Sequence, residues 1–244
     1  MFFHCKLVAL ILVMTLDGQV YTGEIYGGHV AAPHSRPYMV LVEQHMENGT
    51  TKYCSGFILN EDFVMTAAHC QANSYKVLLG VHNFKKTNEI QNISVGESFP
   101  HKEYDPTGYK NDIMLLKLSS KANFNNNVRP IALAGQGDDS LPKSCIVSGW
   151  GRVSRSEKFM SDLLMEVNVT LIDSDQFAKE KLYCSEGETG PAEGDSGGPL
   201  VCEDGKAYGV VSFTFDPDLD GLPKHCYTKI PDNRSWIQSA MKTA

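Results

Sequence analysis

Short runs of apolar residues, separated by turn-forming residues, recur along most of this 244-residue chain. In chain order these runs occupy residues 38–42, 54–59, 63–67, 76–79, 113–118, 144–148, 164–171, 199–202 and 208–215. Strands at this spacing are typical of an all-β barrel or sandwich. The Asn-rich stretch 123–127, ahead of Pro130, is the expected connection between two halves of the chain.

Two segments have a helical pattern instead. Residues 173–181 begin with acidic side chains and end with lysines, as the helix dipole prefers. Residues 232–244 place Trp236, Ile237 and Ala240 on one helical face. We therefore expect one short helix in the second half and another at the C-terminus.

The N-terminus carries a different pattern. Lys6 precedes an apolar run at 7–16 that is too short to span a bilayer and fits the core of a secretory signal peptide. We expect residues 1–22 to be this signal, and no later segment is apolar and long enough to predict a membrane helix. The pattern therefore predicts a protein that is secreted or held in a secretory granule.

Composition narrows the class further. The chain is 42% hydrophobic and 21% charged, which is ordinary for a globular protein, and its length allows one large β domain or two small ones. The formal charge of −7 provides no basic footprint for nucleic acid. Candidate glycosylation sites lie at Asn48, Asn92, Asn168 and Asn233, and we expect about half of them to be used.

Cysteine usage agrees with export. Beyond Cys5 in the expected signal, the cysteines are Cys54, Cys70, Cys145, Cys184, Cys202 and Cys226. An even set of this kind in an exported chain indicates disulfides, although the sequence alone leaves their pairing open.

The stretch 194–200 (Gly-Asp-Ser-Gly-Gly-Pro-Leu) carries the clearest chemistry. A serine hydroxyl is a poor nucleophile at neutral pH and needs a base and a preorganised oxyanion site. Glycines on both sides of Ser196 permit a sharp turn and close substrate approach. Gly194-x-Ser196-x-Gly198 also fits the nucleophile elbow of α/β-hydrolases, so the motif alone does not identify the scaffold.

The order of the partner residues decides between the scaffolds. His69 follows an apolar run, and Asp112 stands at the entrance to another; alone, each is more commonly structural. Together with Ser196 they appear in the order His, Asp, Ser, whereas an α/β-hydrolase needs Ser first, then the acid, then His. The elbow interpretation therefore fails on order.

The chain resembles the chymotrypsin-fold serine proteases along nearly its whole mature length. The matching stretches are residues 25–28, 67–70, 111–113, 149–151, 194–200 and 212–213. Residues 33–39 resemble the signature of the granzyme and mast-cell-protease branch, and residues 23–24 its activation dipeptide.

This resemblance implies a fold of two antiparallel six-stranded β-barrels with a short intermediate helix and a C-terminal helix. The peptidase domain would span residues 25–244, with an N-terminal barrel at about 25–130 and a C-terminal barrel at about 131–244.

The resemblance also implies roles for individual residues. Ser196 would attack a peptide carbonyl, His69 would take and return its proton, and Asp112 would orient the imidazole. The N–H groups of Gly194 and Ser196 would bind the oxyanion. Cleavage before Ile25 would free an α-amino group that pairs with the buried Asp195.

In this family two disulfides carry over, Cys54–Cys70 and Cys145–Cys202. The usual partner of Cys184 is absent, and Cys226 is unexpected. We predict that Cys184 and Cys226 pair with each other, because the strands bearing them run side by side in this fold. Two buried free thiols are the alternative.

Specificity is expected to depend on Gly190, Ser212, Phe213, Thr214 and His225. In relatives, the position of Gly190 forms the base of the pocket for P1, the residue before the scissile bond, and no acid stands there to receive Lys or Arg. Thr214 replaces a glycine and should narrow the pocket. His225, or Lys224 if the alignment slips by one residue, would favour an acidic P1 residue. Small aliphatic P1 residues and a largely blocked pocket are the alternatives.

No cofactor or metal is expected. The expected partners are protein or peptide substrates, an activating dipeptidyl peptidase and serpin-type inhibitors, and we expect a monomer that binds no nucleic acid. The alternative function is a non-catalytic binding protein of the same fold.

Overall fold

The computed structural model describes residues 25, 27–86, 90–135, 141–152, 159–216 and 221–244. The expected signal peptide (1–22) and activation dipeptide (23–24) lie outside these residues. Among the described residues, no helix is long and apolar enough to cross a membrane.

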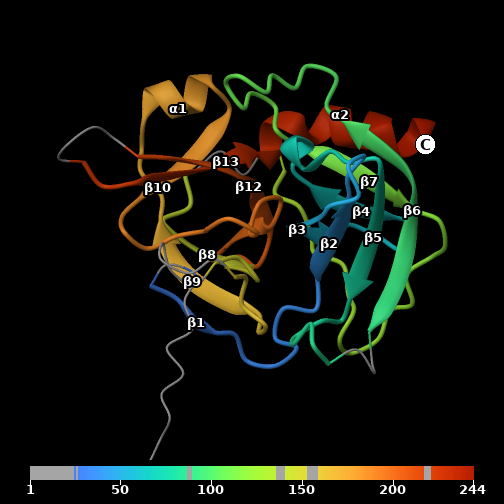
Figure 1. Ribbon diagram of the computed structural model, residues 1–244. Helices are drawn as coiled ribbons and strands as arrows, with labels where there is room; N and C mark the ends of the chain where they lie inside the picture. The colour runs from blue at the N-terminus through green and yellow to red at the C-terminus, as the bar shows by residue number, and fades with distance from the viewer. Residues whose placement is uncertain (1–24, 26, 87–89, 136–140, 153–158, 217–220) are drawn as a thin grey trace, which may run out of the picture.

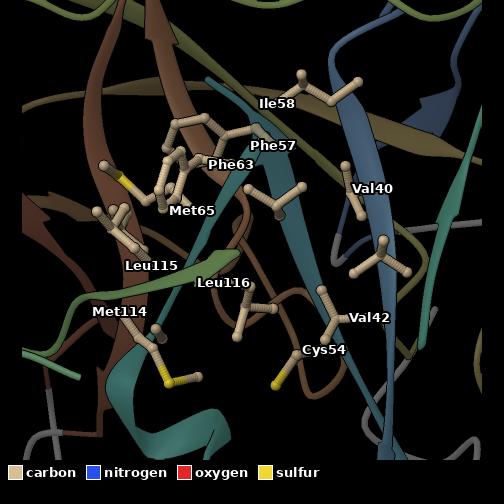
Figure 2. Packing of buried hydrophobic residues seen from close by; sticks show 14 of the residues in the cluster. Val40, Val42, Cys54, Phe57, Ile58, Phe63, Met65, Met114, Leu115 and Leu116 are labelled. Carbon is tan, nitrogen blue, oxygen red and sulfur yellow. The ribbon is translucent and has the colours of Figure 1, made fainter. Parts of the chain in front are cut away.

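The first half of the chain forms a closed antiparallel barrel (Figure 1). Its strands run in the spatial order β2-β3-β4-β7-β6-β5. Their bounds are β2 (Met39–His45), β3 (Thr51–Ile58), β4 (Phe63–Thr66), β5 (Ser74–Leu79), β6 (Gln91–Pro100) and β7 (Met114–Leu118). Figure 2 shows Val42, Phe57, Met65 and Leu116, from four of these strands, packed together in the barrel core.

The second half forms a seven-stranded sheet in the order β1-β9-β8-β11-β12-β13-β10. Its strands are β1 (His29–Val30), β8 (Ser144–Gly149), β9 (Met165–Thr170), β10 (Leu182–Glu186), β11 (Pro199–Cys202), β12 (Ala207–Phe215) and β13 (Lys224–Lys229). A β-bridge between Leu171 and Ser185 joins the end of β9 to β10, so six strands meet around a second core, and the short β1 adds to β9 as a seventh. The predicted all-β fold is confirmed, with a closed six-stranded barrel in the first half and a seven-stranded sheet where the second six-stranded barrel was expected.

Two short helices and a longer C-terminal helix complete the fold of the described residues. The 3₁₀-helix η1 (Ala68–Cys70) follows β4 directly, and α1 (Asp175–Lys179) is shorter than the helical pattern at 173–181 predicted. The C-terminal helix α2 (Ile230–Thr243) begins two residues before the expected start. Its buried Ile237 packs into the core of the first barrel, so the C-terminus of the second half holds the two halves together (Figure 1).

The described residues contain three disulfides. Cys54–Cys70 joins β3 to η1, while Cys145–Cys202 and Cys184–Cys226 each join residues directly opposite each other on neighbouring strands. The predicted pairing of Cys184 with Cys226 is confirmed, with the two Cα atoms 4.2 Å apart across β10 and β13.

Candidate active site

His69 is fixed by the turn that ends β4. The strand is fully buried, and η1 begins two residues after it with Ala68. The next residue after His69 is the buried Cys70, whose disulfide to Cys54 ties this turn to β3. His69 therefore stands at the surface of the barrel on a turn held from both sides, with about a quarter of its side chain exposed (24%).

Asp112 lies two residues before β7 and is completely buried. Its Oδ1 accepts the backbone N–H of His69 at 2.8 Å, and its Oδ2 lies 2.7 Å from His69 Nδ1. The hydroxyl of Ser212 donates to the same Oδ2 at 2.5 Å. A buried charge is tolerable only when it is paired and hydrogen-bonded, and these contacts meet that condition. They also fix the orientation of the imidazole ring.

Ser196 is partly exposed and lies beside the His69 turn. Its carbonyl accepts the N–H of Ser55 at 2.8 Å, and Cys70 Sγ lies 3.9 Å from the same oxygen. Within the described residues, the His69 ring makes no hydrogen bond with the Ser196 hydroxyl, a contact that commonly tightens only when substrate binds. Gly197, with φ +84°, lets the turn that carries Ser196 pack closely against β4, since a Cβ there would lie 2.1 Å from Thr66 Oγ1.

In two peptides beside Ser196, the carbonyl is hydrogen-bonded within the protein. Arg152 N–H holds the carbonyl of Glu193 at 2.8 Å, and Gly198 N–H holds that of Asp195 at 2.9 Å. In a trans peptide the N–H points opposite to the C=O. The N–H groups of Gly194 and Ser196 thus point away from these bonded carbonyls, and among the described residues neither has an acceptor. Two such donors can bind a developing oxyanion.

Asp195 is the second fully buried carboxyl group of the site. It accepts the N–H groups of Gly151 at 2.7 Å and Ala192 at 2.8 Å. Burial outweighs these two bonds and raises its pKa to about 7. Ile25 is also completely buried, in the core of the second half.

The pocket residues predicted from the sequence meet between β12, β13 and the loop after β10. His225 is 1% exposed and stands opposite Thr214 in the β12–β13 register. Its ring lies against Gly190, where a Cβ would come within 2.4 Å of Cδ2. Lys224 instead pairs with Glu186 at 2.8 Å. The alternative alignment, with Lys224 instead of His225 facing the pocket from its wall, does not fit this placement of Lys224.

Tyr109 is a residue of the site that sequence reasoning missed. It stacks on Phe213 with ring centroids 5.3 Å apart, and it meets His69 edge-on at 5.9 Å. Its position three residues before Asp112 was the available clue, but the contact depends on a left-handed backbone (φ 52°) that the residue pattern does not predict. Phe213, Tyr109 and His69 form one continuous aromatic surface.

One group of potential metal ligands falls at this site. Atoms of Cys54, His69 and Cys70 lie within 4.8 Å of one another. Both cysteine sulfurs are joined in a disulfide, so neither is a thiolate able to bind a metal.

The glycosylation candidates differ in accessibility. Asn48, Asn92 and Asn168 are exposed, and Asn48 accepts a hydrogen bond from the hydroxyl of its own triplet's Thr50. Asn233 is only 2% exposed and donates to the carbonyl of Lys229 from inside α2. The folded chain therefore has no room for a glycan at Asn233.

Comparison with known proteins agrees with this geometry. The trypsin family model matches residues 25–237. Mouse granzyme B(G,H) is 38% identical over 98% of this chain and 100% of its own length, and human granzyme H is 39% identical over 96% and 97%. The solved structure "Structure of GrC" matches with a TM-score of 0.78 at 36% identity, covering 88% of this chain and 99% of that one.

The fold and these relatives also define the class of reaction. The chain is a serine endopeptidase, and it belongs to the trypsin family, with granzymes among its relatives.

Proposed function

We propose that this endopeptidase works through His69, Asp112 and Ser196 by an acyl-enzyme mechanism. Ser196 Oγ forms a bond to the substrate carbonyl carbon while His69 Nε2 takes the hydroxyl proton. His69 then gives that proton to the leaving amine as the C–N bond breaks, and water hydrolyses the acyl-enzyme by the same route. The observation that carries the proposal is the buried Asp112 carboxylate, which holds His69 through two contacts of 2.7 and 2.8 Å.

The oxyanion of each tetrahedral intermediate is bound by the N–H groups of Gly194 and Ser196. Support comes from the two carbonyls that Arg152 and Gly198 hold on the opposite side of the same peptides. One such donor is worth on the order of 3 kcal/mol of transition-state stabilisation.

Activation requires removal of residues 1–22 as a signal and 23–24 by a dipeptidyl peptidase. The new α-amino group of Ile25 then pairs with Asp195. Two observations favour this pairing: Ile25 is fully buried, and Asp195 is a buried carboxyl whose described hydrogen bonds come only from neutral N–H groups. The mature enzyme, residues 25–244, is secreted or stored in granules, as a monomer open to serpin-type inhibitors.

The P1 preference is for acidic or small aliphatic residues and not for Lys or Arg. Gly190 brings no charge to the pocket base, and the His225 ring covers it. A long P1 side chain therefore finds no carboxylate at the base of the pocket. Thr214, which is exposed at the pocket wall, adds a hydroxyl within 3.0 Å of that imidazole.

The direct experiment uses protein from which residues 1–24 have been removed. A fluorophosphonate probe should label the wild type and leave Ser196→Ala unlabelled, while a peptide library should be cut after Glu, Asp, Ala or Val. Cleavage led by Phe, Tyr, Lys or Arg would refute the P1 preference. Absence of labelling in correctly processed protein would contradict the proposed nucleophile.

A further inference from the structure

The His225 side chain is held by two different kinds of hydrogen-bonding partner. Its Nε2 lies 3.1 Å from the carbonyl oxygen of Gly187, and its Nδ1 lies 3.0 Å from Thr214 Oγ1. The disulfide of the next residue, Cys226, and the close approach to Gly190 hold the ring in place. The imidazole therefore has little room to rotate away from these partners.

The Gly187 contact decides where the proton of the neutral ring lies. A carbonyl oxygen can only accept, so Nε2 must carry a hydrogen in both protonation states of His225. In the neutral ring Nδ1 is then a lone pair, and it accepts the hydroxyl hydrogen of Thr214. When the ring gains a proton, Nδ1–H donates instead, and Thr214 Oγ1 becomes the acceptor.

The Thr214 hydroxyl therefore changes polarity with the charge of His225. In the neutral state its hydrogen is directed inward, and only oxygen lone pairs face the substrate. In the charged state its hydrogen is released to point into the pocket. Thr214 is exposed, whereas His225 is buried, so the hydroxyl is the part of this pair that a substrate side chain can touch.

We propose that Thr214 is the residue that reads the charge of the P1 side chain, with His225 as the positioning residue that sets its hydroxyl. A P1 carboxylate is accepted when His225 is protonated, because Thr214 then donates to it and the imidazolium lies directly behind. An uncharged P1 side chain is accepted in either state. This inference rests on the acidic arm of the proposed P1 preference.

The charged surroundings are compatible with a proton on His225. Side chains alternate along a strand, so the Lys224–Glu186 ion pair lies on the opposite face of the sheet from His225. Tyr227, on the same face as His225, stays neutral because burial raises its pKa. The charge of Asp195 raises the pKa of Tyr227 further, and Arg152 pairs with Glu193 at 2.9 Å.

The test compares two peptides that differ only in Glu or Gln at P1, with kcat/KM measured from pH 5.5 to 8.5 on processed enzyme. The ratio of the two values is reported, because protonation of His69 affects both peptides alike and cancels. In the wild type the Glu/Gln ratio should fall at least about tenfold as the pH rises through the range in which histidines titrate.

Variants test whether the pH dependence of the Glu/Gln ratio comes from Thr214 and His225. Thr214→Val should give a low ratio that does not change with pH, and Thr214→Ser should restore the dependence. Thr170→Val makes the same change at an exposed position on β9 and should behave as wild type. His225→Asn should also flatten the ratio, and fluorophosphonate labelling of each variant reports that the active site is folded.

The outcomes distinguish the role of Thr214 from the acidic P1 preference itself. A preference for Glu that is independent of pH, or that survives Thr214→Val, would overturn the charge-reading role and leave the acidic preference standing. If an enzyme that labels at Ser196 cleaves neither peptide, the acidic preference itself is wrong and this inference falls with it.

Discussion

Two histidines in this molecule are held by opposite nitrogens. His69 presents Nδ1 to the Asp112 carboxylate, which leaves Nε2 for Ser196 and substrate. His225 presents Nε2 to the Gly187 carbonyl, which leaves Nδ1 for the Thr214 hydroxyl. In both cases a partner that can only accept fixes the neutral tautomer. One ring is then free to move a proton, while the other is closed off from solvent.

The difference lies in the second partner. The Asp112 carboxylate can only accept hydrogen bonds, so His69 Nδ1 is always the donor in their contact. The Thr214 hydroxyl can donate or accept, so its hydrogen bond with His225 Nδ1 can run in either direction. The buried carboxylate thus keeps one tautomer of His69, which leaves its Nε2 able to act as a base. The Thr214 hydroxyl instead reverses its hydrogen-bond direction when His225 gains or loses a proton.

Removing the charge that orients His69 should have the largest effect on activity. In Asp112→Asn, the amide can present an N–H to His69 Nδ1 and favour the wrong tautomer. We expect kcat to fall about 10⁴-fold, as in related triads, with KM little changed. Steady-state kinetics on one good peptide measures this, with Asp173→Asn, an exposed acid, as the control. A loss below about tenfold would show that Asp112 does not set the tautomer.

Asp195 is a buried carboxyl group like Asp112, but its described partners are neutral backbone N–H groups. In the uncleaved chain its pKa is about 7, against 3.8 for an ordinary Asp, so the folded state holds a proton that the unfolded chain releases near pH 4. Folding therefore becomes less favourable as the pH rises between these values, by on the order of 4 kcal/mol in total. The Ile25 ammonium should remove most of this cost by lowering the pKa of Asp195.

Thermal unfolding of Ser196→Ala, before and after removal of residues 1–24, measures the effect without autolysis. The gain in Tm on processing should be several degrees larger at pH 7.5 than at pH 5. Equal gains at both pH values would contradict the pairing of Ile25 with Asp195.

Gly190→Ala tests the His225 side. The added Cβ would lie 2.4–2.7 Å from Cδ2, Nε2 and Cγ of His225, so the ring must move, at a cost of about 1–3 kcal/mol. We expect lower stability in urea and loss of the Glu/Gln discrimination at low pH. Gly96→Ala, whose Cβ would meet nothing closer than 3.8 Å, is the control. Unchanged discrimination in Gly190→Ala would mean that the ring position does not matter.

Ser212→Ala should lower activity far less than Asp112→Asn. It removes the 2.5 Å donor to Asp112 Oδ2 but leaves both His69 contacts in place. A hydrogen bond to a charged group is worth about 1.5–3 kcal/mol, so kcat/KM should fall by roughly 10- to 100-fold. That is far less than in Asp112→Asn, and Ser119→Ala, at an exposed position, should change nothing. A loss as large as that of Asp112→Asn would mean that Ser212, not the carboxylate, organises the site.

Much of the fold could be predicted from the apolar runs, because most strands bury a continuous or alternating set of side chains. The apolar runs do not include β1, β6, β10 or β13, and in the largely polar β6 Ile93 is the one buried residue. The pairing of β6 with β5 and β7 comes from barrel closure, which no local pattern encodes.

The candidate site shows the same division. His69, Asp112 and Ser196 could be named from their order in the chain, and His225 from its distance to a recognised motif. The roles of Arg152, Tyr109 and Gly187 could not, because each acts through a backbone group or ring placed by a distant segment. The polarity of Thr214 depends on the β12–β13 register, which places it opposite His225.

The opposed tautomers of the two histidines can be observed directly. Nitrogen-15 NMR of the imidazole rings in processed Ser196→Ala, recorded at pH 8.5, distinguishes a protonated Nδ1 from a protonated Nε2. We predict hydrogen on Nδ1 of His69 and on Nε2 of His225. A His225 ring protonated at Nδ1 instead would contradict the account, because Thr214 would then accept in the neutral state and could not change polarity.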